Sequence, residues 1–185
     1  MEWTATGTLT ARPALAHPEL LAVPVTAALG VLDPALAASV GVAPIDPNVA
    51  DTAAFCERYG ISMDASANCV VVKGKRGGDV RYAACMVLAS TRADVNGLVR
   101  RHLDVRSVSF APMDEAVALT GMEYGGITPI GLPADWPILV DAAVAASREV
   151  VIGGGVRASK LFLPGSVLAA LPGAQVIEAL GRSVG

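Results

Sequence analysis

Two apolar runs flank a polar, glycine-rich segment in the first half of the chain. The runs cover residues 69–73 and 82–88, and valine and small apolar residues dominate them. The segment between them, 74–79, combines three glycines with charged residues, which is typical of a turn. This pattern predicts a β-hairpin. Because the runs are continuously apolar rather than alternating, we expect both faces of the hairpin to be covered.

Capping residues and helical spacing predict several short helices. Asp51 or Thr52 is expected to cap the helix that Gly60 ends, and Asp114 is expected to cap the helix that Gly121 ends. Asp141 is expected to cap a further helix or to accept backbone N–H bonds in a turn. The predicted helices cover residues 18–29, 53–59, 94–103, 116–120, 142–146 and 166–171.

Shorter apolar runs predict further strands near residues 40–45, 108–110, 138–140, 150–152 and 160–163. Strands outnumber helices and do not alternate regularly with them, so we expect an α+β fold. A chain of 185 residues suits a single domain. We predict one mixed, curled, barrel-like sheet flanked by helices over residues 18–185, preceded by an extended N-terminal arm over residues 1–17.

The segment 120–133 is rich in glycine and proline and has the composition of a binding loop. Gly125 and Gly126 admit positive φ angles and close approach to the main chain, whereas Pro129 and Pro133 fix φ and remove two donors. A rigid loop with bare N–H groups can hold a carbonyl, a carboxylate or a ribose hydroxyl. The alternative is a tight connection between two strands.

Three segments in order carry a resemblance to a known family. They are the glycine-proline loop at 125–131, the strand at 136–141 that ends in Asp141, and the glycine turn at 150–155. Together with Ile45, Asp46 and Pro47, they make the chain similar to the YbaK and prolyl-tRNA synthetase-associated editing domain family. The resemblance covers roughly residues 18–181, and it implies a fold of the α+β kind predicted above.

Proteins of this family hydrolyse the ester between a wrong amino acid and its tRNA. The resemblance therefore implies a freestanding aminoacyl-tRNA deacylase that clears synthetase errors on small amino acids, with proline tRNA as one candidate. A separate editing step is needed because a synthetase pocket discriminates between two amino acids that differ by one methylene by only about 1 to 3 kcal/mol of binding free energy. The family takes its nucleophile from the substrate or from water, so no Ser-His-Asp or Cys-His set is expected. No metal or organic cofactor is expected either, because the sequence has no cluster of ligands to hold one. The partners implied are the acceptor end of an aminoacyl-tRNA and, in trans, a synthetase.

Two positions depart from the family pattern. Asn68 stands where bacterial deacylases of the family carry a lysine before the first hairpin strand, and Lys73 lies five residues further on. Lys160 stands where the family has an acid. One hypothesis is that Lys160 restores, from another strand, the cation missing at position 68. The alternative is an exposed lysine at the start of a strand.

The predicted catalytic residues are Gly125, Gly126, Thr128, Pro129 and Asn68, which can donate a hydrogen bond but supplies no charge. The loop backbone is expected to stabilise the oxyanion of the reaction, and Thr128 to contact the substrate. Glu123 precedes the loop and is expected to bind an α-amino group or to act as a general base, provided that it projects into the pocket. The predicted substrate-binding residues are Ile127, Glu123, Gly154, Lys160 and Lys73.

Charge is distributed unevenly along the chain, whose net charge is −3. Residues 73–106 hold eight Lys and Arg against three Asp, a net charge of +5, which leaves −8 for the remainder. A local basic segment on an acidic protein suits a partner that is touched at one place, such as the acceptor end of a tRNA. The alternative is a set of solvated strand edges and one helix face.

The apolar content of 53% is high, yet no apolar run approaches the roughly 18 residues of a membrane span. The first residues lack the basic region of a secretory signal, so we expect a cytoplasmic protein that does not insert in membranes. The oligomeric state is open.

Cys56, Cys69 and Cys85 are too far apart in sequence to form a metal-binding pair, and only two histidines are present, so no metal site is expected. Each cysteine is flanked by small apolar residues and is expected to be buried.

Two rival functions remain. One is a non-catalytic module with the same pocket that binds an aminoacyl group, a nucleotide or a tRNA end, which Asn68 favours. The other is a hydrolase that uses the Cys69 thiol.

Overall fold

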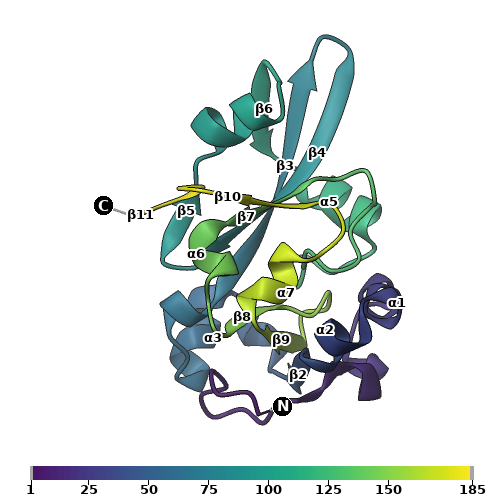
Figure 1. Ribbon diagram of the computed structural model, residues 1–185, viewed down its shortest axis with the longest axis vertical. Helices are drawn as coiled ribbons and strands as arrows, with labels where there is room; N and C mark the ends of the chain where they lie inside the picture. The colour runs from purple at the N-terminus through teal and green to yellow at the C-terminus, as the bar shows by residue number, and fades with distance from the viewer. Residues whose placement is uncertain (1, 184–185) are drawn as a thin grey trace.

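The computed structural model describes residues 2–183 and contains two larger sheets and a two-stranded ribbon (Figure 1). The first sheet is mixed, because β7 lies parallel to both of its neighbours and the other pairs are antiparallel. Its order is β10 (Ala174–Ile177), β7 (Ile138–Asp141), β4 (Asp79–Leu88), β3 (Ala67–Arg76) and β6 (Ser107–Phe110).

The second sheet is fully antiparallel, and its order is β1 (Arg12–Pro13), β2 (Gly41–Pro44), β9 (Ser159–Leu163) and β8 (Val150–Gly153). The ribbon pairs β5 (Thr91–Ala93) with β11 (Gly181–Ser183). The predicted α+β fold is confirmed, but the sheet does not close into a barrel. The two larger sheets are joined only by an isolated parallel bridge between Ser66 and Val151 among the described residues. The ribbon and β10 lie outside the strands that the sequence predicted.

The helices are short and lie between and beside the sheets. They are α1 (Val23–Val31), α2 (Pro34–Ala38), α3 (Thr52–Tyr59), α4 (Arg100–His102), α5 (Met113–Thr120), α6 (Ala142–Ala145) and α7 (Gly165–Ala169), with a π-helical turn at Val95–Val99 and 3₁₀ turns at Ala14–Ala16, Pro18–Leu20, Pro47–Val49 and Met63–Ala65. None of the described helices is long and apolar enough to cross a membrane.

Several predicted helix ends are confirmed by the capping geometry. Asp51 accepts hydrogen bonds from the N–H groups of Ala53 and Ala54, and Gly60 ends α3 in the left-handed region at φ 69°. Asp141 caps α6 by accepting from the Ala143 N–H. Such contacts lie within a few residues of one another, which is why the sequence predicts them.

Three helix predictions need correction. The helix expected over residues 18–29 is broken, because Pro24 favours the first turn of a helix and therefore starts α1 afresh after the 3₁₀ turn. Asp114 lies inside the first turn of α5, whose N-cap is Pro112. The stretch 94–103 begins as a π-helical turn capped by Asp94 and becomes α-helical only at α4.

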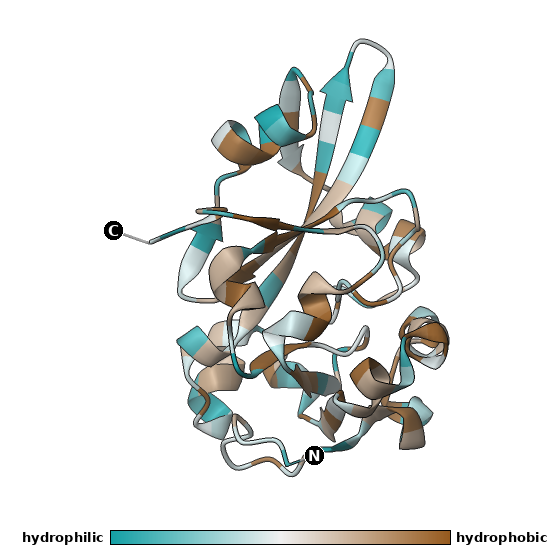
Figure 2. Ribbon diagram, viewed as in Figure 1, coloured by the Kyte–Doolittle hydropathy of each residue, from teal (hydrophilic) through white to brown (hydrophobic). Residues whose placement is uncertain are grey.

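The hairpin β3–β4 is longer than predicted and changes character along its length (Figure 2). Its inner half is buried, with Val72, Ala83 and Ala84 fully enclosed. Its outer part, from Lys75 to the turn, is exposed and polar. The expectation that both faces are covered is therefore confirmed for the inner half, which contributes to an apolar cluster on each side, whereas the tip projects from the body (Figure 1).

The largest apolar cluster lies between the two sheets and draws on α1, α7 and strands of both sheets. A second cluster lies between the five-stranded sheet and the π-helical turn, with Val99 and Leu139 at its centre. The N-terminal residues pack on the body: the Trp3 Nε1 donates to the Ser39 carbonyl at 3.0 Å, and Glu149 accepts from the Thr4 and Ala5 N–H groups. The two clusters enclose β3 through Ala67 on one side and Val72 on the other.

Candidate functional site

A cavity of about 560 Å³ opens where the first half of β3 meets the start of α3, the glycine loop and β9. This volume lies within the range of small-molecule sites. Segments far apart in sequence form its wall: residues 50–53, Met63, residues 67–71, Phe110, Ala111, Ala116, Tyr124, Gly125, Ile127, Arg157 and Lys160. The cavity brings together four of the predicted site residues, Asn68, Gly125, Ile127 and Lys160.

Asn68 lies on the wall of the cavity, and Thr52 orients its amide. The Thr52 Oγ1 donates to the Asn68 Oδ1 at 2.7 Å. With its oxygen occupied in this way, the amide has its Nδ2 hydrogens available for a ligand. Thr52 was predicted only as a possible helix cap, so its contact with Asn68 is a feature that sequence reasoning missed.

Lys160 is buried, with 6% of its surface exposed, so the exposed lysine considered as an alternative is excluded. Its Nζ donates to the Ala50 carbonyl at 3.1 Å and lies 4.9 Å from the centre of the Phe55 ring. Burial penalises the ammonium and lowers the pKa of Lys160 below its ordinary 10.5, although Cys56 and Asp51 oppose the shift. An ammonium has three donors, and two of them have no acceptor among the described residues.

The segment 50–52 links these two side chains. Its first residue accepts the hydrogen bond from Lys160, and its last residue donates to Asn68. The chain therefore places one cation and one amide on either side of the α3 N-terminus, at the wall of one cavity.

Arg157 is a second cation at the cavity, and sequence reasoning gave it no role. Its guanidinium donates to the Tyr124 carbonyl at 3.1 Å and to the Pro47 carbonyl at 2.9 Å. Gly125 has φ +86°, and a Cβ at this position would lie 2.5 Å from the Arg157 Nη1. The arginine therefore ties the glycine loop to the turn before α3, and the glycine makes room for it. In the sequence, Gly125 indicated that some group approaches the loop closely, but the sequence did not show that this group is the Arg157 guanidinium.

The glycine loop contributes less of its backbone to the cavity than the sequence suggested. The Gly126 N–H donates to the Glu123 carbonyl at 2.9 Å, and the Gly126 carbonyl accepts from the Gly155 N–H at 2.7 Å. Gly126 and Pro129 do not line the cavity, and neither does Thr128, which is fully buried and whose Oγ1 has no hydrogen-bond partner among the described residues. The expectation of bare donors is wrong for Gly126, because its polar groups pair with the loop and with the Gly155 turn. The N–H groups of Gly125 and Ile127 have no acceptor among the described residues.

Three further predicted residues lie away from the cavity. The Glu123 carboxylate accepts from the Arg157 backbone N–H at 2.6 Å, so it holds the loop and does not project into the pocket. Gly154 is enclosed, and a Cβ there would lie 2.2 Å from the Ser159 Oγ. Lys73 donates to both carboxylate oxygens of Glu115 at 2.7 Å.

The main chain of β3 supplies a polar group that the sequence could not reveal. Strand β6 pairs only with residues 72–75 of β3, and beyond them the Ala111 N–H donates to the Val71 carbonyl. Since backbone groups alternate from edge to edge of a strand, the N–H and carbonyl of Cys69 lie on that same edge, where no strand within residues 2–183 pairs with them. This open edge borders the cavity.

The Cys69 side chain does not have the character of a nucleophile. Burial raises the pKa of its thiol, and the neighbouring Cys85 adds to the shift. The thiol therefore stays protonated near neutral pH, which argues against the thiol-dependent hydrolase. Within residues 2–183, no group of three His, Cys, Asp or Glu side chains could hold a metal ion.

Comparisons with known proteins agree with this architecture. Residues 46–171 match the family model described as the aminoacyl-tRNA editing domain. A candidate trans-editing enzyme for prolyl-tRNA synthetase superposes with a TM-score of 0.71 at 22% identity, covering 88% of this chain and 99% of the other. A scaffold protein used for computational epitope grafting gives a TM-score of 0.72 at 23% identity, covering 88% and 97%. A hypothetical protein gives 0.69 at 22% identity, covering 80% and 95%. At these identities the solved structures establish the fold.

Proposed function

The chain belongs to the aminoacyl-tRNA editing domain family, and from that premise we propose that it is a freestanding deacylase that hydrolyses the ester of a mischarged tRNA in trans. The substrate is a small amino acid on the 3′ end of a tRNA, with proline tRNA as the first candidate. The observation that carries the proposal is that Lys160 and Asn68 lie on the wall of one cavity, because Lys160 supplies a cation there although position 68 is not lysine.

In the proposed reaction, water attacks the ester carbonyl carbon, and the carbonyl oxygen becomes an oxyanion. The Asn68 Nδ2 and the free Cys69 N–H are the donors offered to that oxygen, and the Lys160 ammonium supplies the compensating charge. Preorganised donors of this kind in a water-poor site commonly contribute a factor of about 10² to 10³ each to the rate. The carbon–oxygen bond to the ribose then breaks, and the ribose oxygen takes up the proton that the attacking water gives up, which leaves the free amino acid and the uncharged tRNA.

The size of the proposed substrate follows from the wall of the cavity. Its apolar lining includes Ile127, Val71 and Met63, and its volume of about 560 Å³ has to accommodate the terminal nucleoside as well as the amino acid. A small side chain fits this arrangement better than a large one. Because its pKa is lowered, the Lys160 ammonium is also a stronger acid, which favours proton transfer to the ribose oxygen.

A non-catalytic binding module is the rival function, and the neutral side chain at Asn68 favours it. Hydrolysis of alanyl, cysteinyl and seryl esters on proline tRNA separates the two functions when wild type is compared with Lys160→Met. We expect ester loss with wild type and at least a tenfold slower reaction with the variant. No loss on any ester, with the aminoacyl-tRNA still bound, would establish the binding module instead.

A variant at Gly126 is not suited to this experiment. A Cβ at that position would lie 2.5 Å from the Val156 backbone, so a larger residue disturbs the fold rather than the chemistry. Lys160→Met keeps an unbranched side chain of similar size and removes the ammonium, with its charge and its hydrogen bond to Ala50, and its folding is monitored by thermal unfolding.

A further inference from the structure

A second cavity, of about 820 Å³, adjoins the first. Three residues line both cavities: Asn68, Val70 and Phe110. Asn68 and Val70 are two positions apart on β3, a rise of roughly 6.6 Å along the strand. A ligand that enters the first cavity can therefore continue directly into the second across this short stretch of β3.

Phe110 stands at the boundary of the two cavities with an exposed ring. It ends β6 opposite Val72 of β3, and 67% of its surface is exposed. An aromatic ring left in solvent between two cavities is a platform on which a flat group can stack. Stacking of a nucleic-acid base on such a ring contributes about 1 to 3 kcal/mol in single-strand binding proteins.

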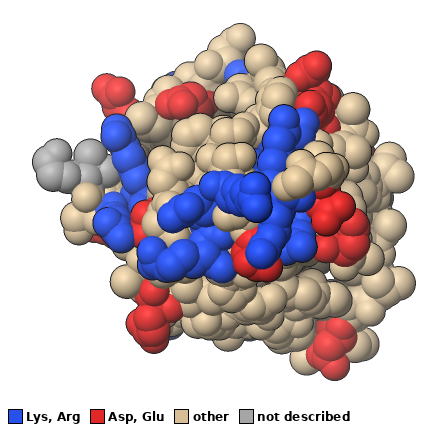
Figure 3. Space-filling model, turned by 90° about the horizontal axis from the view of Figure 1, so that it is seen from above, with Lys and Arg blue, Asp and Glu red and all other residues tan. Residues whose placement is uncertain are grey.

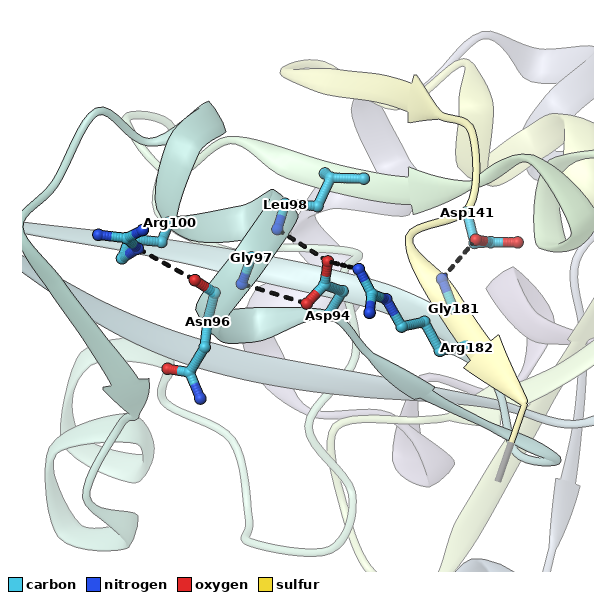
Figure 4. Close-up of polar contacts among 8 residues, drawn as sticks. All are labelled: Asp94, Asn96, Gly97, Leu98, Arg100, Asp141, Gly181 and Arg182. Atoms are coloured by element: carbon cyan, nitrogen blue, oxygen red, sulfur yellow. Dashed lines mark hydrogen bonds and ion pairs between the residues drawn. The ribbon is translucent and has the colours of Figure 1, made fainter. Parts of the chain in front are cut away.

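Two arginines face each other on the far wall of the second cavity. Arg92 of β5 and Arg182 of β11 are direct partners in the antiparallel ladder, where like charges oppose each other unfavourably. Asp94 neutralises Arg182 at 2.6 Å (Figure 4). The same carboxylate also accepts the N–H groups of Gly97 and Leu98. Arg92 is exposed and forms no ion pair with any residue in 2–183, so the wall has an uncompensated cation that an anion would neutralise.

The charge of the neighbouring surface narrows the class of anion. Seen from above, Lys and Arg side chains gather at the end of the molecule that carries the hairpin tip (Figure 3). Besides Arg92, the exposed basic residues between positions 73 and 106 are Lys75, Arg76, Arg81, Arg100, Arg101 and Arg106. A basic surface of this extent beside a cavity with one free arginine and one free aromatic ring is complementary to a polyanion that carries bases.

We infer that the second cavity is a nucleotide subsite, which binds the single-stranded nucleotide preceding the 3′-terminal one by stacking its base on Phe110 and pairing its phosphate with Arg92. The inference rests on the proposed function, since it places the aminoacylated 3′ end in the first cavity. It predicts that a tRNA end binds more tightly than an isolated aminoacyl nucleoside.

The test measures RNA binding and ester hydrolysis separately. The binding probe is a labelled, uncharged RNA hairpin with a single-stranded CCA 3′ end, and the short substrate is 3′-O-alanyl adenosine, which reaches only the first cavity. The variants are Phe110→Ala and Arg92→Gln. Their matched controls are Met113→Ala, an exposed residue of α5, and Arg148→Gln, an exposed arginine, neither of which lines a cavity.

We expect Phe110→Ala and Arg92→Gln each to weaken binding of the RNA hairpin about tenfold, which corresponds to about 1.4 kcal/mol. Loss of one phosphate contact should also reduce the slope of log affinity against log salt by about 0.7 for Arg92→Gln and leave it unchanged for Phe110→Ala. Hydrolysis of 3′-O-alanyl adenosine should be the same in Arg92→Gln as in wild type, because Arg92 lines only the second cavity.

The inference is overturned if wild type does not bind the RNA hairpin, or if the two variants bind it as well as their controls do. It is also overturned if Arg92→Gln slows the hydrolysis of 3′-O-alanyl adenosine as much as it weakens RNA binding, because the arginine would then act on the first cavity. If wild type hydrolyses no ester but the two variants still lose RNA binding, the nucleotide subsite stands and the proposed catalysis fails.

Discussion

The Thr52 hydroxyl donates to the Asn68 amide oxygen across 2.7 Å, so a residue at the start of α3 determines which way the Asn68 amide faces. Together with the bond from Lys160 to Ala50, this contact builds the cavity wall around three consecutive residues. The arrangement suggests how a family member can keep a polar, cationic site although it carries no lysine at position 68.

Thr52→Val tests the orienting role of the hydroxyl. The variant keeps the shape of the side chain and removes the donor, so the Asn68 amide is free to rotate away from the substrate. We expect kcat for a cleaved alanyl ester to fall about tenfold with little change in KM, since the amide acts on the oxyanion rather than on the ground state. A change in KM alone would assign Asn68 to substrate binding.

Lys160→Met should reduce deacylation while leaving the protein equally stable or more stable. The buried ammonium makes one hydrogen bond, and burial of a charge that is not fully compensated costs free energy. Removing a group kept for chemistry therefore relieves a folding cost. Thermal unfolding and single-turnover hydrolysis of the same preparation check this. A large loss of stability would mark Lys160 as a structural residue.

The charge hypothesis is tested by exchanging the two positions. Asn68→Lys in the Lys160→Met background returns one cation to the cavity from the strand where the family carries it. We expect the double variant to be at least tenfold faster than Lys160→Met alone, whereas Asn68→Lys in wild type places two like charges in one cavity and gains no rate. Equal rates for the double variant and Lys160→Met would show that the cation is not interchangeable.

The stability of the protein should depend on pH through Lys160. Desolvation lowers the pKa of this lysine in the folded state below 10.5, so between the two values the unfolded chain binds more protons than the folded one. Stability then rises with pH over that window and is lost as pH falls toward the folded-state pKa. The free energy of unfolding is measured with urea for wild type and Lys160→Met from neutral pH to pH ~10. As pH increases, the free energy of unfolding of wild type should rise relative to that of the variant. A constant difference would contradict the shift.

Lys73→Met should leave hydrolysis of the alanyl ester unchanged, because Lys73 lies outside the cavity and is bound to Glu115. The hydrogen bond from Lys73 and that from Tyr82 lower the pKa of Glu115, which stabilises the fold above the ordinary carboxyl pKa and is lost as pH falls. The variant should therefore lower the urea midpoint at neutral pH and reduce its dependence on acid pH. A selective loss of hydrolysis would return Lys73 to the substrate site.

Much of the local structure was predictable from the sequence. The β3–β4 hairpin, the caps at Asp51 and Asp141 and the end of α3 at Gly60 all depend on neighbours within a few residues. The break in the first predicted helix was missed because a proline near a helix start is compatible with both a continued and a restarted helix.

The membership of the site was only partly predictable. Asn68 and Lys160 were found as departures from a family pattern, and both line the cavity. Gly126, Thr128 and Pro129 belong to the same motif but face away from the cavity, because pairing between Gly126 and Gly155 decides the path of the loop. Residues of a motif are close in sequence, but the residues that line a cavity come from segments that are close only in the folded structure.

The sequence by itself determined the β3–β4 hairpin, the caps at Asp51 and Asp141 and the family to which the chain belongs, because short-range hydrogen bonds and apolar patterns depend on neighbouring residues. Only the tertiary structure decided that Lys160 is buried against Ala50, 110 residues away, and that Phe110 remains exposed between two cavities. Burial and exposure depend on which distant segments pack together, and that packing sets the pKa of Lys160 and the chemistry of the site.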